Sequence, residues 1–88
     1  MRITVELSLY PLQADFIGPI SDFIRELRLE PGIEIVTNQL STQLRGEFGA
    51  VMGAFSRCTE AAMNRAHPIV LVAKFVNADL DIASPSSV

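Results

Sequence analysis

The sequence predicts a small α+β sandwich of βαββαβ order, with two helices on one face of a four-stranded antiparallel sheet. Residues 3–10 alternate strictly between apolar and polar side chains. Residues 15–30 and 48–66 instead carry apolar side chains three and four positions apart, and residues 33–47 and 69–76 have the patterns of a hairpin and a last strand. A period of two is typical of half-buried strands, and the longer spacing is typical of amphipathic helices.

The first strand is expected over residues 3–10. Pro11 should end it, because proline cannot donate a hydrogen bond to a neighbouring strand. The first helix is expected over residues 15–30, with its regular part starting at Gly18-Pro19, since proline suits the first helical position. Pro31-Gly32 should then stop this helix.

Residues 33–37 and 40–47 are expected to form the hairpin, and the charges predict its register. Matching the apolar faces of the two strands allows only alternate registers. Pairing Ile35 with Leu44 sets Glu34 opposite Arg45, whereas a two-residue slip sets Glu34 against Glu47. Opposite charges across a ladder are favourable and like charges are not. The first register is therefore predicted.

This register has two further consequences. It sets Thr37 opposite Thr42 on the side that faces the helices. It also places Leu40 with Leu44 on the apolar face of the second hairpin strand.

The second helix is expected over residues 48–66, and the last strand over residues 69–76. The apolar stripe of this helix is read as Phe48, Met52, Phe55, Thr59, Ala62 and Ala66. Cys58 falls beside that stripe and is interpreted as a small buried hydrophobe. Strand, helix, hairpin, helix and strand, joined by right-handed crossovers, give the ferredoxin-like arrangement with spatial strand order 4-1-3-2.

Residues 1–77 are expected to form a single domain. Residues 78–88 form a C-terminal tail that ends in Ser84-Pro85-Ser86-Ser87. Such turn and linker composition is typical of disordered segments, so disorder is expected in the tail.

Composition excludes several kinds of partner. The net charge of −3, with only seven Lys and Arg residues, argues against nucleic-acid binding. No apolar stretch of about 20 residues is present, so no membrane insertion is expected. One cysteine and one histidine cannot form a zinc-type site, and no cofactor is expected. A single cysteine also fits a reducing compartment, and a cytoplasmic location is expected.

The sheet face without helices is expected to meet another subunit. Polar side chains at its centre are flanked by valines at both edges: Thr4, Glu6, Ser8 and Tyr10 on one central strand, Ser41, Gln43, Arg45 and Glu47 on the other, and Val36, Val70, Val72 and Val76 around them. A solvated face would be more uniformly polar. A homodimer or homotetramer is therefore expected, with Glu6, Arg45 and Glu34 forming a partly buried charge network.

Several short motifs, in order, resemble one known family. They are Ser8-Leu9-Tyr10-Pro11-Leu12, Gly18-Pro19-Ile20, Thr37-Asn38-Gln39-Leu40-Ser41-Thr42 with Gly46, and Ala73-Lys74-Phe75-Val76-Asn77. Together they are similar to the YkoF-like thiamine-binding proteins. The resemblance implies a ferredoxin-like fold, oligomeric assembly, and non-catalytic binding of thiamine or its hydroxymethylpyrimidine moiety in thiamine salvage or transport.

The resemblance and the residue chemistry together suggest a ligand site near the hairpin turn. An aminopyrimidine offers ring-nitrogen acceptors and an amino donor on a flat face, and hydroxyls, amides and an aromatic ring suit it. The candidate ligand-binding residues are Ser8, Tyr10, Thr37, Asn38, Ser41 and Thr42. Without the motif, an ordinary cross-strand pair is the favoured interpretation of the threonines, and a turn residue is that of Asn38. Tyr10 could equally be an interface anchor.

Two other functions stay open. The chain could be a structural or regulatory oligomeric module that binds a protein partner through its bare sheet face. It could also be a small ferredoxin-like enzyme of the isomerase type. No Ser/His/Asp set suggests itself, and a lone His67 before Pro68 offers little general-base chemistry, so no catalytic residue is predicted and an enzyme is not expected.

Overall fold

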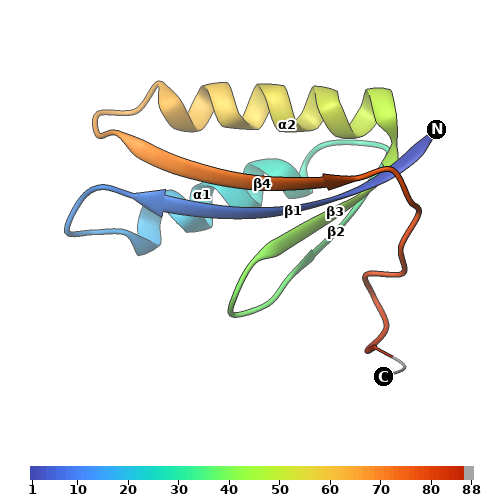
Figure 1. The fold of residues 1–88 in the computed structure, drawn as a ribbon. Helices are drawn as coiled ribbons and strands as arrows, with labels where there is room; N and C mark the ends of the chain where they lie inside the picture. Colours follow the sequence, from blue (N-terminus) through green and yellow to red (C-terminus); the bar gives the residue numbers. More distant parts are fainter. Residues whose placement is uncertain (87–88) are drawn as a thin grey trace.

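The computed structural model describes residues 1–86 and has the predicted fold class. Its elements are β1 (Arg2–Pro11), α1 (Ile17–Arg28), β2 (Ile33–Thr37), β3 (Thr42–Glu47), α2 (Phe48–Met63) and β4 (Ile69–Val76). The four strands form one antiparallel sheet in the order β2-β3-β1-β4, which is the predicted order read from the other edge. Both helices lie on one side of this sheet (Figure 1).

The predicted hairpin register is confirmed. Ile35 pairs with Leu44, Glu34 pairs with Arg45, and Thr37 pairs with Thr42. The Glu34 and Arg45 side chains form the expected ion pair, with Oε2 2.9 Å from Nη2.

The expected start of the second hairpin strand was wrong. β3 begins at Thr42, and Leu40 lies in the turn with 90% of its surface exposed. The carboxamide oxygen of Asn38 accepts hydrogen bonds from the backbone N–H groups of Leu40 (2.9 Å) and Ser41 (3.0 Å). This closes a local turn that takes Leu40 out of the ladder, so it does not share the apolar face with Leu44.

Other boundaries differ by a few residues. β1 continues through Pro11, which pairs with Ile69 on β4. α1 runs from Ile17 to Arg28, and α2 ends at Met63 instead of residue 66. Helix ends are where sequence patterns are least informative, since the last turn carries few core contacts.

The core lies between the helices and the helix-facing side of β1 and β3. Its fully buried large side chains are Val5, Leu7, Leu27, Leu44 and Val51. The predicted stripe of α2 was right in part: Ala62 is buried and Met52 and Phe55 pack against the core, whereas Phe48 and Ala66 are exposed. Small and medium side chains face the sheet (Val51, Ala54, Cys58 and Ala62), whereas Phe48 and Met63 are exposed. Three of the four buried side chains of α2, those of Val51, Ala54 and Cys58, lie beside the predicted stripe.

The turn after α1 packs tightly against β3. Gly32 has a φ of 77°, a conformation that glycine adopts without steric cost. A Cβ on Gly46 would lie 3.0 Å from the Gly32 carbonyl oxygen and 3.4 Å from a Val51 methyl. Gly46 thus lets the turn, the strand and α2 come together.

The charges on the bare sheet face pair differently from the expected network. Arg45 pairs with Glu34 and, at 3.5 Å, with Asp79 of the tail. Glu6 instead accepts a hydrogen bond from the Ser41 hydroxyl at 3.0 Å and lies 3.5 Å from the Lys74 amine. Glu6 lies opposite Lys74 on β4, which explains its choice of partner.

The chain after β4 turns to the side of the sheet away from the helices (Figure 1). The Thr4 hydroxyl donates to the carbonyl of Ala78 (2.8 Å) and accepts from the N–H of Leu80 (3.0 Å). Arg45 donates to the Leu80 carbonyl at 2.6 Å, and Arg2 pairs with Asp79 at 3.0 Å. These contacts join the start of the tail to β1 and β3. The domain boundary at residue 77 and the disorder of the tail stay predictions.

Candidate ligand-binding site

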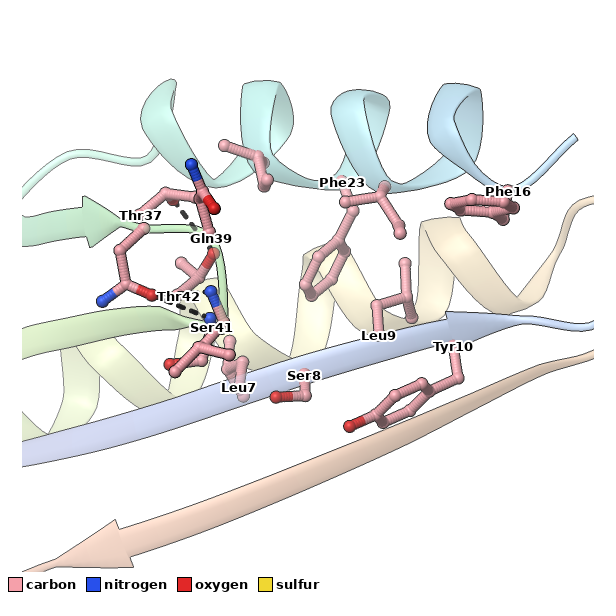
Figure 2. A pocket seen from close by; sticks show the side chains of 14 residues that line it. Leu7, Ser8, Leu9, Tyr10, Phe16, Phe23, Thr37, Gln39, Ser41 and Thr42 are labelled. Atoms are coloured by element: carbon pink, nitrogen blue, oxygen red, sulfur yellow. Dashed lines mark hydrogen bonds between the residues drawn. The ribbon is translucent and has the colours of Figure 1, made fainter.

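A pocket of about 320 Å³ lies between α1, β1 and the β2–β3 turn (Figure 2). Its lining comes from three segments: Leu7, Ser8, Leu9 and Tyr10; Phe16, Ile20, Phe23 and Ile24; and Thr37, Asn38, Gln39, Leu40, Ser41 and Thr42. All six residues predicted to bind a ligand are among them. The volume lies at the small end of the range for small-molecule sites.

The pocket exists because two neighbouring strands end at different levels. The last pair between β1 and β3 joins Leu7 to Thr42. β1 then continues to Pro11, and from Ser8 onward it pairs with β4 alone within the described chain. The space beside the part of β1 that has no β3 partner is covered by α1, and the hairpin turn closes it at one end. Such a strand edge presents main-chain donors and acceptors to whatever lies beside it.

The wall between β1 and α1 is apolar. Leu9 points from β1 toward the Phe23 side chain of α1, while Phe16 lies at the far end from the hairpin (Figure 2). Phe23 is buried, with 3% of its surface exposed, whereas the Phe16 ring is 54% exposed. A flat apolar ring entering the pocket would therefore contact side chains along one whole side.

The hairpin end supplies the polar groups. The hydroxyls of Thr37 and Thr42 lie 2.9 Å apart, and Thr42 is buried, with 6% of its surface exposed. Within this pair one hydroxyl donates to the other. That leaves one O–H group to donate and oxygen lone pairs to accept. The pair can serve both a ring nitrogen and an amino group.

The structure shows Asn38 as the residue that shapes the turn. Its carboxamide oxygen accepts from the backbone N–H groups of Leu40 and Ser41, and the backbone N–H of Asn38 donates to the Ser41 carbonyl at 3.0 Å. Asn38 therefore lines the pocket mainly as a structural residue.

Ser8, Tyr10 and Ser41 line the pocket from another direction. Ser8 and Tyr10 project to the side of β1 away from α1 (Figure 2). The Ser41 hydroxyl is bound to Glu6 and also accepts a hydrogen bond from Gln43 at 2.7 Å. The six predicted residues thus meet at one pocket but divide between the two faces of the sheet.

The sequence profile of the YKOF-related family matches residues 2–87, nearly the whole chain. The chain belongs to the YKOF-related family. None of the curated proteins matches it.

Solved structures support the fold of this YKOF-related chain. Protein SP2199 of Streptococcus pneumoniae superimposes with a TM-score of 0.81 at 23% identity, over 91% of this chain and 90% of that one. A domain of unknown function (DUF77) from Bacillus cereus gives 0.75 at 16% identity, over 93% and 84%. A Thermotoga maritima protein provisionally assigned to thiamine biosynthesis or salvage, TM0486, gives 0.75 at 18% identity, over 99% and 91%.

Sequence reasoning missed part of the pocket of this YKOF-related chain. Gln39 lies in the turn between Asn38 and Ser41 and was not among the predicted ligand-binding residues. The apolar wall from α1 (Ile20, Phe23 and Ile24) was seen only as a core-facing stripe, although Ile20 and Ile24 are only partly buried. Apolar side chains of a helix that extend past the end of the strand pair beneath them have no strand to cover them, and this could have indicated a cavity.

Other functions would require a metal site, a membrane-spanning helix or a reactive thiol among the described residues. Within residues 1–86, no three His, Cys, Asp or Glu side chains are grouped so that they could hold a metal ion. No helix in that range is long and apolar enough to cross a membrane. Cys58 is buried, and burial together with the nearby Glu30 carboxylate raises its pKa to about 11. A thiol with that pKa is a poor nucleophile at neutral pH.

Proposed function

We propose that this protein binds thiamine or its hydroxymethylpyrimidine moiety, without catalysis, in the pocket between α1 and the hairpin turn. The observation that carries the proposal is the Thr37–Thr42 hydroxyl pair at the hairpin end of a pocket whose α1 wall is apolar. Membership in the YKOF-related family and likeness to TM0486 add support.

The pocket suits an aminopyrimidine for a simple chemical reason. Such a ring needs apolar contact on its faces and a few hydrogen bonds at its edge. Phe23 and Leu9 provide contact, and the threonine pair provides one donor and free acceptors. Burial of Thr42 strengthens these bonds, because little water competes there.

Titration calorimetry of the full chain with thiamine and with hydroxymethylpyrimidine tests the proposal. Saturable heat from at least one ligand, with the ligand recovered unchanged, is the expected result. Absence of heat from both at millimolar concentration would overturn the function and leave the fold untouched.

We further propose that the protein acts as a homodimer or homotetramer in the cytoplasm, in thiamine salvage or transport. Val70 and Val72 on the bare sheet face are 45% and 46% exposed, which favours burial against a second subunit. A structural or regulatory oligomeric module that binds another protein through the same face is the alternative, and it predicts no heat with thiamine or hydroxymethylpyrimidine.

A further inference from the structure

We propose that the pocket selects the free alcohol form of its ligand and rejects phosphate esters of the same compound. This inference rests on the proposed function and concerns the class of ligand that the same pocket accepts. It is argued from the charges in and around the lining.

The lining has no charged side chain. Its described residues are aliphatic, aromatic, hydroxyl or carboxamide residues only. A phosphate monoester carries roughly −1.5 to −2 charges at pH 7. Taking such a group out of water without a cationic partner is strongly unfavourable.

Six of the seven Lys and Arg side chains are paired with carboxylates, and Arg28, exposed in the last turn of α1, does not line the pocket. Arg57 binds Glu30, and Arg65 binds Asp22 and Glu26, in ion pairs that join α1 to α2. The cations of the bare face are paired with carboxylates as well: Arg2 with Asp79, Arg45 with Glu34, and Lys74 with Glu6. Arg25 follows the lining residue Ile24, but its guanidinium lies 2.9 Å from the Asp22 carboxylate and is largely exposed.

Two carboxylates adjoin the pocket instead. Glu6 accepts the hydrogen bond from the lining residue Ser41 at 3.0 Å. Asp15 precedes the lining residue Phe16 and lies 3.4 Å from the backbone N–H of Gly18 in the first turn of α1. A helix N-terminus attracts anions, and here a side-chain carboxylate already lies beside it. Both carboxylates would repel a phosphate.

The free alcohol meets none of these obstacles. A neutral hydroxymethyl group can donate to or accept from the Thr37–Thr42 pair or the Gln39 carboxamide at the same end of the pocket. Gln39 lines this end of the pocket and is exposed at the hairpin tip, so a cation can be introduced there without disturbing the core.

Calorimetry with hydroxymethylpyrimidine and its monophosphate, and with thiamine and its diphosphate, tests this selection. The wild type should bind each free alcohol at least about tenfold more tightly than its ester. Gln39→Lys should tighten ester binding about tenfold, because it adds a charge-assisted hydrogen bond. Ala61→Lys, which adds the same charge on the exposed side of α2, is the matched control and should leave the ratio unchanged.

The outcomes separate this inference from the proposed function. Esters that bind the wild type as tightly as the alcohols would overturn the selection while supporting the function. Equal tightening of ester binding by Gln39→Lys and Ala61→Lys would also overturn it, since the effect would then reflect net charge. Failure of every ligand to bind would overturn the function and the selection with it.

Discussion

Glu34 and Arg45 lie directly opposite each other on β2 and β3, with a carboxylate oxygen 2.9 Å from a guanidinium nitrogen. Arg45 also reaches Asp79 and the Leu80 carbonyl, so it connects the hairpin to the tail. Arg45→Glu should therefore lower the free energy of unfolding by more than the roughly 0.2–1 kcal/mol of one cross-strand pair. Urea denaturation measures the change.

The charge exchange Glu34→Arg with Arg45→Glu is the control for this prediction. It restores an opposite-charge pair across the ladder but sets the introduced carboxylate of β3 beside Asp79. Partial recovery of stability is expected, because the hydrogen bond from Arg45 to the Leu80 carbonyl stays lost. If the double exchange is no more stable than Arg45→Glu alone, the hairpin pair contributes nothing measurable.

Thr4→Val should release the start of the tail. The Thr4 hydroxyl bridges the Ala78 carbonyl and the Leu80 N–H, and it is buried. Its loss should cost about 1 kcal/mol and speed hydrogen exchange at the Leu80 amide. Ser8→Ala, on the same side of β1 and closer to the pocket, should leave that amide unchanged. A Leu80 amide that exchanges freely in the wild type would instead support the tail disorder expected from the sequence.

Thr42→Val should weaken ligand binding while leaving the fold intact. The substitution keeps the shape and removes the hydroxyl that lies 2.9 Å from Thr37. Losing one buried hydrogen-bond partner typically costs about 1–3 kcal/mol, or roughly 5- to 150-fold in affinity. Calorimetry measures the affinity and circular dichroism checks the fold. Unchanged affinity would place the ligand away from the threonine pair.

Val72→Asp should shift the protein toward the monomer. Val72 is half-exposed on the bare sheet face, opposite Ser8 on β1. A carboxylate there would be desolvated in a subunit interface. Light scattering at micromolar concentration is the measurement, with Ala61→Asp on the outer side of α2 as the control. A wild type that is already monomeric would contradict the expected assembly.

Stability should fall in alkaline solution because of Cys58. Burial and the Glu30 carboxylate raise its pKa to about 11, above the value of about 8.5 for an unfolded chain. Deprotonation therefore favours the unfolded state. The contribution of the protonated Cys58 thiol to the free energy of unfolding is complete below about pH 8.5 and is lost as the pH rises toward 11. Denaturant unfolding should show a loss of about 1–2 kcal/mol between pH 7.5 and 10 in the wild type. In Cys58→Ala the loss should be smaller, and an equal loss in both proteins would contradict the assignment.

The sequence predicted those parts of the fold in which local pattern and charge agree. The hairpin register followed from apolar alternation together with Glu34 and Arg45, and the structure has it. The stripe of α2 followed only in part, because Gly49, Gly53 and several alanines leave its helical pattern ambiguous. Ala62 was predicted to be buried and is, but Phe48 was assigned to the core in place of Val51 and Ala54, which are fully buried.

The sequence predicted the end of the sheet at which the candidate residues lie, but not how their side chains are arranged around the pocket. The hairpin motif indicated one end of the sheet, and all six candidates line one pocket there, although ligand binding at this pocket stays a prediction. The offset between the ends of β1 and β3 was not predictable, because it depends on where β3 starts. That start is set by the Asn38 turn, whose hydrogen bonds are to main-chain groups that the sequence does not distinguish.

The Asn38 turn also bears on the speed of recognition. Its three hydrogen bonds close the hairpin end without help from any ligand. Because the hairpin turn is already ordered before a ligand binds, the protein loses little conformational entropy on binding. Association should then approach the rate of unhindered diffusion, and differences in affinity between related ligands should reside in how long each one stays bound.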